Sequence, residues 1–330
     1  MIFLDEKRYG VTNNYFLNEH YIAYGFFGSI KSQYGLTPDD ASGISYSKKE
    51  AILKCYNEFL ERFKMGVKIG VEKEIPIYNN GTNSFIMERA SDFSYGYNKK
   101  YGYIDTTGTA ARFSHGDAMQ TALNELIEKN ELFLFWYKNC GCYVEKTQKI
   151  NELIRIRNYA SSRIEIFETE ELSNMSTFIV VGMHNGRIKT SGISTNINPM
   201  EAINKALDEA RLLEWINYNN VQSSLENVGD KSMAQTVNYL ENKCNTLKKY
   251  KWDEFKKDKI IYQELVKNIQ FAVLNNKNDF EGLVLKCISK DLFNCIPLKE
   301  RILKDCNKNI MKRYGITKAD VHNKPDCILL

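Results

Sequence analysis

Residues 114–137 read SHGDAMQTALNELIEKNELFLFWY, and this stretch decides how the chain folds. Ser114 is a typical helix N-cap residue, and Asp117 stands three positions later, where an acid completes a capping box or a close relative of one. The stretch ends in an uninterrupted apolar run, LFLFWY. It therefore predicts a long helix over 116–137 whose C-terminal end lies at the buried centre of the fold.

The same pattern occurs at two other places in the chain. One copy begins at Ser47 and the other at Asn198, and each has a glutamate at the third helical position. In every copy an alanine follows this acid, and a second acid follows the alanine seven residues later; the three later acids are Glu58, Glu125 and Glu209. The copies predict further helices over 48–64 and 199–217. Their intervals differ, so the chain is not a solenoid of equal repeats.

Acidic side chains recur at matching depths on these three predicted helices. Residues three apart share a helix face, so Glu58 projects with Glu61 and Glu125 projects with Glu128. Converging carboxylates repel one another unless cations neutralise them. Hard oxygen ligands suit Mg²⁺, which commonly bridges to substrate phosphates. The pattern predicts a Mg²⁺–nucleotide site between three helices, with five metal ligands: Glu58, Glu61, Glu125, Glu128 and Glu209.

Three basic residues on the same helices are candidates to neutralise phosphate oxygens, namely Lys54, Arg62 and Lys129. A simpler interpretation also accounts for each copy alone, because Glu-x-x-Glu is common on solvated helix faces. The threefold occurrence, with matching caps and matching spacing, is what favours a shared site.

Composition places the chain among globular proteins and excludes several classes. It has 330 residues, of which 43% are hydrophobic and 26% charged, and its formal net charge is +4. No basic stripe accompanies this charge, so we expect no nucleic-acid partner. We find neither a run of about 18 apolar residues nor a signal-peptide core, so we expect no membrane span. The eight scattered cysteines fit reduced thiols in the cytoplasm.

Strand signals surround the predicted helices and indicate an α/β (α+β) fold. Strands are predicted at 72–86 in pieces, 163–167, 177–182, 189–193, 270–274 and 282–289, with a hairpin turn at His184–Gly186. We predict one domain over 1–330, with internal pseudo-repeats of capped helices packed on β-sheets. Residues 1–40 form an extension of uncertain structure, and 218–260 a peripheral helical region.

Three segments of this chain resemble the motifs of the YcaO family. Residues 105–131 are similar to the central signature of that family. Ser42-Gly-Ile-Ser45 together with Glu58-Phe-Leu-Glu-Arg62 looks like its first motif, and residues 192–209 look like its third. The similarity covers roughly residues 40 to 330, and the order and spacing of the motifs are its most specific feature.

The resemblance implies a fold and a chemistry. YcaO proteins bind ATP and Mg²⁺ through these glutamates and phosphorylate a peptide-backbone amide oxygen. A Cys, Ser or Thr nucleophile of a ribosomal precursor peptide then gives an azoline, as in bacteriocins. Implied partners are that peptide, a leader-binding protein and a flavin dehydrogenase, in a stand-alone, microcin-type arrangement. Implied nucleotide-binding residues besides the glutamates are Ser42, Ser45, Lys54 and Arg62; implied catalytic groups are Arg62, Lys129 and the Leu330 carboxylate.

The chain departs from the family pattern at several positions. Ile44 stands where the family has Lys, Leu212 where it has Gln, and Lys129-Asn130 where it has Arg-Asp. The tail has a single proline, Pro325, where azoline-forming members have a Pro-rich tail. Two alternatives therefore stay open: a thioamide- or amidine-forming enzyme of the same fold, and a catalytically inactive scaffold subunit.

Overall fold

The three capped segments form the three long helices of the structure, α1 (Lys48–Gly66), α2 (His115–Tyr137) and α4 (Pro199–Tyr218). In each helix the repeated alanine donates its N–H to the carbonyl of the cap residue, which is Ser47, Ser114 or Asn198. The predicted helices are thus confirmed, caps included.

This computed structural model describes residues 9–12, 20–29, 31–32, 35–66, 74–218, 225, 227–251, 258–275 and 282–329.

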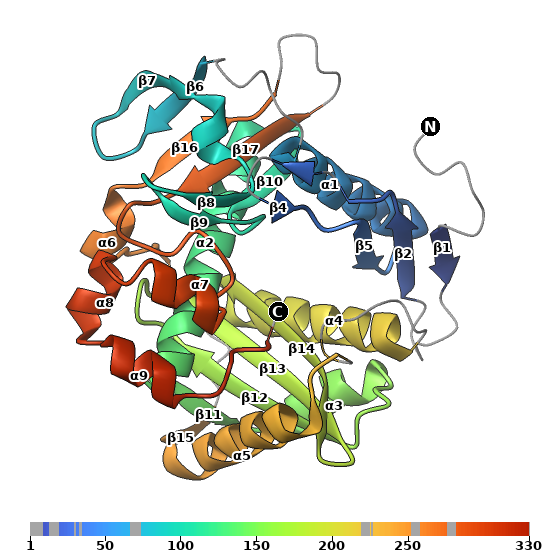
Figure 1. Cartoon of the computed structure of the whole chain (residues 1–330). Coiled ribbons are helices and arrows are strands. Elements are labelled where there is room, and N and C mark those ends of the chain that lie inside the picture. The colour runs from blue at the N-terminus through green and yellow to red at the C-terminus, as the bar shows by residue number, and fades with distance from the viewer. Residues whose placement is uncertain are drawn as a thin grey trace.

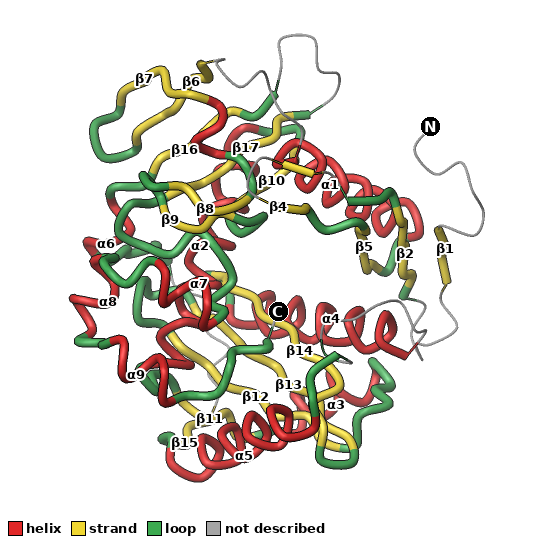
Figure 2. The backbone as a smooth tube through the Cα atoms, in the orientation of Figure 1, coloured by secondary structure: helices red, strands yellow, loops and turns green. Residues whose placement is uncertain are grey.

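Three larger sheets and two small hairpins carry these helices (Figures 1 and 2). The first sheet has the order β1-β2-β5, the second β10-β17-β16-β6-β7 and the third β14-β13-β12-β11-β15, and β3-β4 and β8-β9 are two-stranded. The strands are β1 (Tyr9–Thr12), β2 (Tyr21–Phe26), β3 (Lys31–Ser32), β4 (Gly35–Leu36), β5 (Asp40–Ser45), β6 (Glu74–Asn79), β7 (Ser84–Arg89), β8 (Gly96–Asn98), β9 (Gly102–Ile104), β10 (Thr109–Arg112), β11 (Cys142–Glu145), β12 (Arg163–Thr169), β13 (Ser176–His184), β14 (Arg187–Asn196), β15 (Lys249–Lys251), β16 (Gln270–Val273) and β17 (Leu283–Ile288). The predicted strand regions are confirmed within the described residues, and positions 72 and 73 of the first region lie outside them.

Each long helix follows directly on a strand at the end of a sheet: β5 precedes α1, β10 precedes α2 and β14 precedes α4. A glycine on two of these strands lets the helix backbone approach closely. A Cβ on Gly43 would overlap Ala51 O, and one on Gly192 would overlap Ala206 O. The pseudo-repeat seen in the sequence is therefore a strand–helix unit, and it brings the three helices together with similar geometry.

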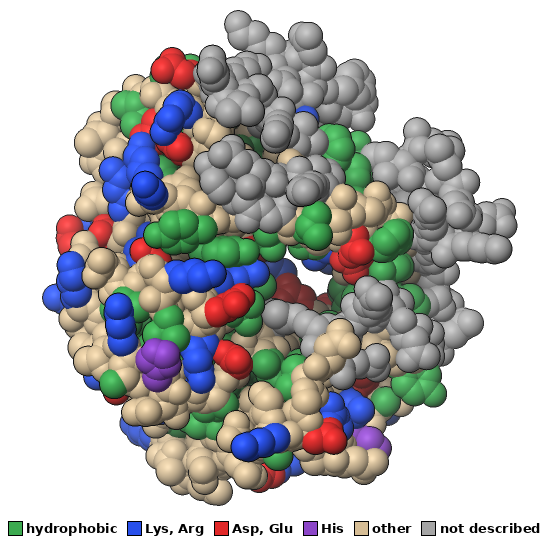
Figure 3. All heavy atoms as spheres, in the orientation of Figure 1, with side chains coloured by type: hydrophobic (Ala, Val, Ile, Leu, Met, Phe, Trp, Pro, Cys, Tyr) green, Lys and Arg blue, Asp and Glu red, His purple; other side chains and the backbone are tan. Residues whose placement is uncertain are grey.

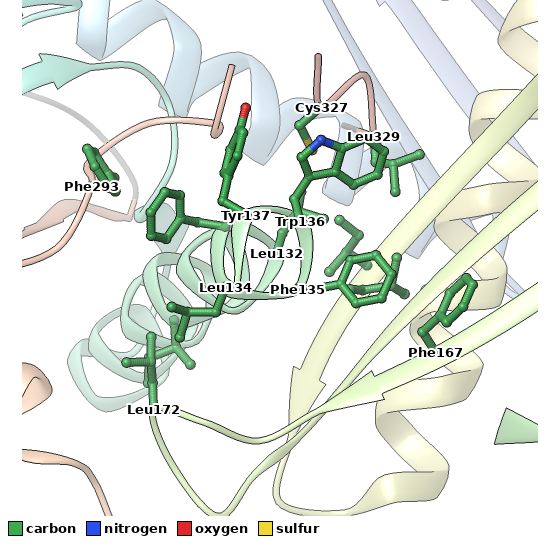
Figure 4. Close-up of a cluster of buried hydrophobic side chains, with 14 of the residues drawn as sticks. Leu132, Leu134, Phe135, Trp136, Tyr137, Phe167, Leu172, Phe293, Cys327 and Leu329 are labelled. Carbon is green, nitrogen blue, oxygen red and sulfur yellow. The ribbon is translucent and has the colours of Figure 1, made fainter. Parts of the chain in front are cut away.

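The apolar end of α2 forms the centre of the largest core cluster, as predicted. Phe135 and Trp136 are fully buried. Figure 4 shows Phe135 directed toward Phe167, with ring centroids 5.0 Å apart, and Trp136 directed toward Leu329. Burying a side chain of this size contributes about 1.5–3 kcal/mol. This half of α2 fixes the helix so that its other half can hold polar groups in place.

The shorter elements lie outside the three strand–helix units. They are α3 (Gln148–Ile156), α5 (Asp230–Thr246), α6 (Glu264–Lys267), α7 (Lys299–Lys304), α8 (Asn309–Tyr314), α9 (Lys318–Asn323) and the 3-10 turn η2 (Ala90–Phe93). The helix expected within 218–260 is α5, and it buries Met233 and Leu240 in the main core as well as covering the sheet. The described part of 1–40 contains strands that the sequence did not predict. No helix among the described residues is long and apolar enough to cross a membrane.

Candidate active site

The five glutamates predicted to form a site converge from α1, α2 and α4. Three of them, Glu61, Glu125 and Glu209, have pKa values that are raised by burial and by the charges of neighbouring glutamates. Burial raises the pKa of Glu125 to about 8, and the negative charges of Glu61 and Glu128 add to this. Burial also raises the pKa of Glu209 to about 7, with Glu128 contributing. Carboxyls from all three helices therefore lie within electrostatic reach of one another.

Backbone N–H groups of three strands hold carboxylates of this set. Glu58 Oε2 accepts from Ser42 N on β5 at 2.5 Å, and Glu61 Oε1 accepts from Ala111 N on β10 at 2.7 Å. Glu209 Oε2 lies 3.4 Å from Ile193 N on β14. Each of these strands is the last in its sheet within the described part of the chain, so its outer edge is open to the site. Backbone groups at the edges of three sheets thus hold Glu58 and Glu61 on α1 and Glu209 on α4.

Among the described residues, four cationic side chains form ion pairs with these carboxylates. Lys129 Nζ is 3.2 Å from Glu128 Oε1, and Lys205 Nζ is 3.7 Å from Glu209 Oε1. Burial lowers the pKa of Lys129, but the surrounding glutamates outweigh it and raise the value above normal. Glutamates also raise the pKa of Lys205, whose side chain is 61% exposed. Both amines are therefore protonated at neutral pH.

Two arginines complete the cationic set and differ in their bonding. Arg62 bonds Glu58 Oε1 at 2.6 Å and Asp40 Oδ1 at 2.5 Å, and it also donates to the Asp40 carbonyl. Arg112, at the end of β10, lies 3.8 Å from Glu61 Oε1. Burial raises the pKa of Glu61 to about 7, and Arg112 opposes that increase. Arg62 is thus bound into the wall of the site, whereas the carboxylate contact of Arg112 is a single long ion pair.

Figure 3 shows a hollow in the middle of the molecule's face, with charged side chains in its depth. In the same orientation, Figure 1 places α1 above this hollow and α4 below it, with α2 beside both. The exposed fraction of the side chain is 6% for Glu128 and 36% for Glu209, so the acidic set extends from the floor of the site toward solvent.

The remaining predicted site residues lie in different surroundings. Ser42 adjoins Glu58, as described, and Lys54 Nζ donates to Ile44 O at 2.8 Å. The Ser45 hydroxyl donates to Glu50 at 2.7 Å, at the first turn of α1. Roles for Ser45 and Lys54 in nucleotide binding stay predictions.

Leu330, whose carboxylate was predicted to act in catalysis, lies outside the described residues. The preceding Leu329 is buried in the main core, and Pro325 O accepts from Trp136 Nε1 at 2.9 Å. Burial raises the pKa of Cys327 to about 12, and the charge of Lys129 opposes this. The described end of the tail therefore packs beside α2, near a cation of the site.

Sequence reasoning missed two of the four cations, Lys205 and Arg112. Lys205 stands one helical turn before Glu209, and this spacing is a usable signal for an ion pair. Arg112 is the last residue of a four-residue strand, which is too short for an alternating pattern to show which way its side chain points. Its place beside Glu61 depends on how β10 meets α1.

The donor set fits Mg²⁺ and a phosphate-bearing ligand. Carboxylate oxygens are the hard ligands that Mg²⁺ takes, and the nearby lysines and arginine suit phosphate oxygens. Among the described residues, no three His, Cys, Asp or Glu side chains are grouped closely enough to hold a metal unaided. Mg²⁺ is usually bound by one or two carboxylates, with water and substrate phosphates as further ligands.

Comparison with known proteins decides the family. The model of the YcaO cyclodehydratases, described as binding ATP and Mg²⁺, matches residues 75–287. The chain belongs to the YcaO family. The match includes α2 and α4 of the YcaO domain, while Glu58 and Glu61 on α1 precede it. No curated protein matches the chain by sequence.

Solved structures share the YcaO fold at low sequence identity. YcaO from Methanopyrus kandleri, bound with AMPPCP and Mg²⁺, is 13% identical with a TM-score of 0.68, over 89% of this chain and 87% of that one. The E. coli microcin synthetase McbBCD complex contains a chain that is 14% identical with a TM-score of 0.67, over 96% and 95%. A heterocyclase in complex with substrate and cofactor is 13% identical with a TM-score of 0.61, over 93% and 52%.

Membership fixes the general chemistry of this YcaO protein. Its family consists of ATP- and Mg²⁺-binding cyclodehydratases, so ATP and Mg²⁺ are its cofactors. The mixed helix and strand architecture predicted from the sequence is that of the YcaO structures.

Proposed function

We propose that this YcaO protein activates a backbone amide of a ribosomally made precursor peptide and forms an azoline at a Cys, Ser or Thr residue. The side-chain thiol or hydroxyl adds to the amide carbon, and the amide oxygen leaves as phosphate. Bound Mg²⁺–ATP supplies the phosphoryl group that makes this oxygen a good leaving group. The net change in the peptide is the loss of one water molecule, coupled to conversion of ATP to ADP and phosphate.

The observation that carries this proposal is the convergence of five glutamates and four cations from three strand–helix units. An ordinary core does not collect nine such groups, because desolvating them is costly without a ligand that uses them. Phosphoryl transfer needs this mixture, with carboxylates to hold metal ions and cations to spread the charge of the phosphates.

Roles for individual residues follow from their contacts. We assign metal binding to Glu58, Glu61, Glu125, Glu128 and Glu209. Lys129, 3.2 Å from Glu128, is placed to neutralise phosphate oxygens. Arg62 has its terminal nitrogens on Asp40 and Glu58, so we assign it to holding Glu58 in position.

The test is calorimetric binding of Mg²⁺–ATP to the wild type and to Glu128→Gln, an isosteric change that removes one charge. We expect the variant to bind at least roughly 100-fold more weakly, a loss of about 2.7 kcal/mol. Glu264→Gln, at an exposed position on α6, serves as the charge-matched control and should bind normally. Undiminished affinity in Glu128→Gln contradicts the site assignment. A wild type that binds Mg²⁺–ATP neither alone nor with a partner protein supports the inactive scaffold instead.

Substrate and partners rest on the same resemblance. One heterocyclase relative was solved with its substrate, and the microcin synthetase relative is a multiprotein complex. We propose a leader-binding partner and, where azolines are oxidised, a flavin dehydrogenase, all in the cytoplasm. Mass spectrometry of the precursor peptide tests the reaction: a loss of about 18 Da per site fits an azoline or an amidine, and exchange of oxygen for sulfur indicates a thioamide. Replacing the modified Cys, Ser or Thr by Ala should abolish the loss if the product is an azoline, because that side chain is its nucleophile.

A further inference from the structure

The two arginines at the acidic site differ in what they can still bind. Arg62 bonds Asp40 and Glu58 through both terminal nitrogens, and only 19% of its side chain is exposed. A guanidinium engaged in this way offers few free N–H groups to a ligand. Its bonds instead connect β5 to α1 and steady Glu58.

Arg112 keeps most of its hydrogen-bonding capacity. Its Nη1 donates to Ala111 O at 2.7 Å and lies 3.8 Å from Glu61 Oε1. Within the described part of the chain, Nη2 and Nε have no bond recorded, and 37% of the side chain is exposed. A guanidinium has five N–H donors in a planar fork that matches two oxygens of a phosphate. The fork of Arg112 is therefore available.

The position of Arg112 lies between two helices that carry carboxylates. It ends β10, and Glu61 faces it from α1. From α4, Lys205 is near enough for the two positive charges to affect each other. Neither cation has a close carboxylate partner, since their shortest ion pairs are 3.8 and 3.7 Å. Close charge-assisted bonds are about 2.7–2.9 Å. Two weakly paired cations that repel each other favour an anion between them.

We propose that Arg112 binds the phosphate chain of the nucleotide from the β10 side of the site. This inference rests on the proposed function and names a contact within it. Lys205 approaches the same anion from α4, and Glu61 keeps the guanidinium near the site until the phosphate replaces that long ion pair. The assignment explains why an arginine with free donors stands beside an acid already bonded to backbone.

The experiment compares dissociation constants for Mg²⁺–ATP, Mg²⁺–ADP and AMP in the wild type, Arg112→Gln and Arg112→Lys. Removing a charge-assisted contact should weaken Mg²⁺–ATP binding by roughly 10- to 100-fold in Arg112→Gln. Binding of AMP should change less, because fewer phosphates reach the fork. Arg112→Lys, which keeps the charge but not the fork, should lie between the two. Arg155→Gln, at an exposed site on α3, is the charge-matched control and should bind like the wild type.

The outcomes separate this inference from the proposed function. If the wild type binds Mg²⁺–ATP and Arg112→Gln binds it equally well, the role of Arg112 is wrong and the site assignment survives. Equal weakening for all three nucleotides in Arg112→Gln also overturns it, because a phosphate contact must discriminate among them. Thermal melting of each variant shows whether it is folded; should Arg112→Gln unfold, Arg112→Lys decides by the same ratio of ATP to AMP weakening. Absence of nucleotide binding by the wild type, both alone and with a partner protein, overturns the proposed function itself.

Discussion

The two halves of α2 differ in the side chains that they bury: one buries apolar rings and the other carries carboxyl groups. The C-terminal half buries Phe135 and Trp136 completely against other apolar side chains. The part of the helix up to Glu128 places Glu125 and Glu128 among other carboxylates, where burial and neighbouring charge raise the pKa of Glu125 to about 8. One half lowers the free energy of the fold, and the other half raises it in the absence of a ligand. The comparison teaches that the apolar half stabilises a polar half that could not fold this way alone.

The largest expected effect is in the apolar half. Phe135→Ala removes a fully buried ring and should lower the free energy of unfolding by about 3–5 kcal/mol. Urea unfolding followed by circular dichroism measures this. Phe85→Ala is the matched control, because the Phe85 side chain on β7 is 69% exposed, and its effect should stay within about 0.5 kcal/mol. Equal effects of the two changes would contradict the assignment of the core.

The next largest effect is expected for a change in the polar half, which should alter nucleotide binding rather than stability. Glu125→Gln should weaken Mg²⁺–ATP binding roughly 100-fold, or about 2.7 kcal/mol. The free energy of unfolding should not fall, since burial already favours the neutral form of Glu125, which Gln resembles. Calorimetry and urea unfolding on the same variant test both statements. A variant that loses stability but still binds the nucleotide would reverse the roles given to the two halves. Glu152→Gln, on the exposed face of α3, controls for the change in net charge.

The smallest effect concerns a buried amine beside the apolar half. Lys243 Nζ donates to Phe135 O at 2.5 Å, and burial lowers its pKa to about 7. The unfolded chain, with an ordinary lysine pKa near 10.4, binds more protons between these values. Lys243 therefore contributes a rise in stability as the pH increases from about 7 to about 10, by at most about 1.4 kcal/mol per pH unit, against the opposite contribution of buried cysteines such as Cys327, whose pKa burial raises. Urea unfolding of the wild type and of Lys243→Met at about pH 7.5 and about pH 8.5 isolates this contribution, which should be at most about 1.4 kcal/mol over that interval. Equal slopes in the two proteins would mean that Lys243 does not cause it.

Sequence reasoning succeeded where the signal is local. Caps at Ser47, Ser114 and Asn198 and the 3.6-residue period marked the long helices, and repetition of the acid marked the site. The order of the sheets was not accessible, because strand pairing across long intervals leaves no local pattern. Helices α7 to α9 were missed because six residues are too few to show a period.

The contacts of the site were harder to predict than its acids. Asp40 holds Arg62 from 22 positions away, and nothing in either segment marks the pair. Arg112 meets Glu61 only because β10 runs beside α1 in the folded protein. Residue types and spacing identified which groups carry charge, but pairing depends on packing between strand–helix units.

The three strand-edge bonds described above have a consequence for solubility. An open sheet edge offers unpaired N–H groups to any passing strand and is a route to aggregation. Here β5, β10 and β14 turn such edges toward the interior, and Glu58, Glu61 and Glu209 occupy an N–H on each. The same glutamates that gather at the site thus also occupy strand-edge N–H groups that another chain could otherwise pair with.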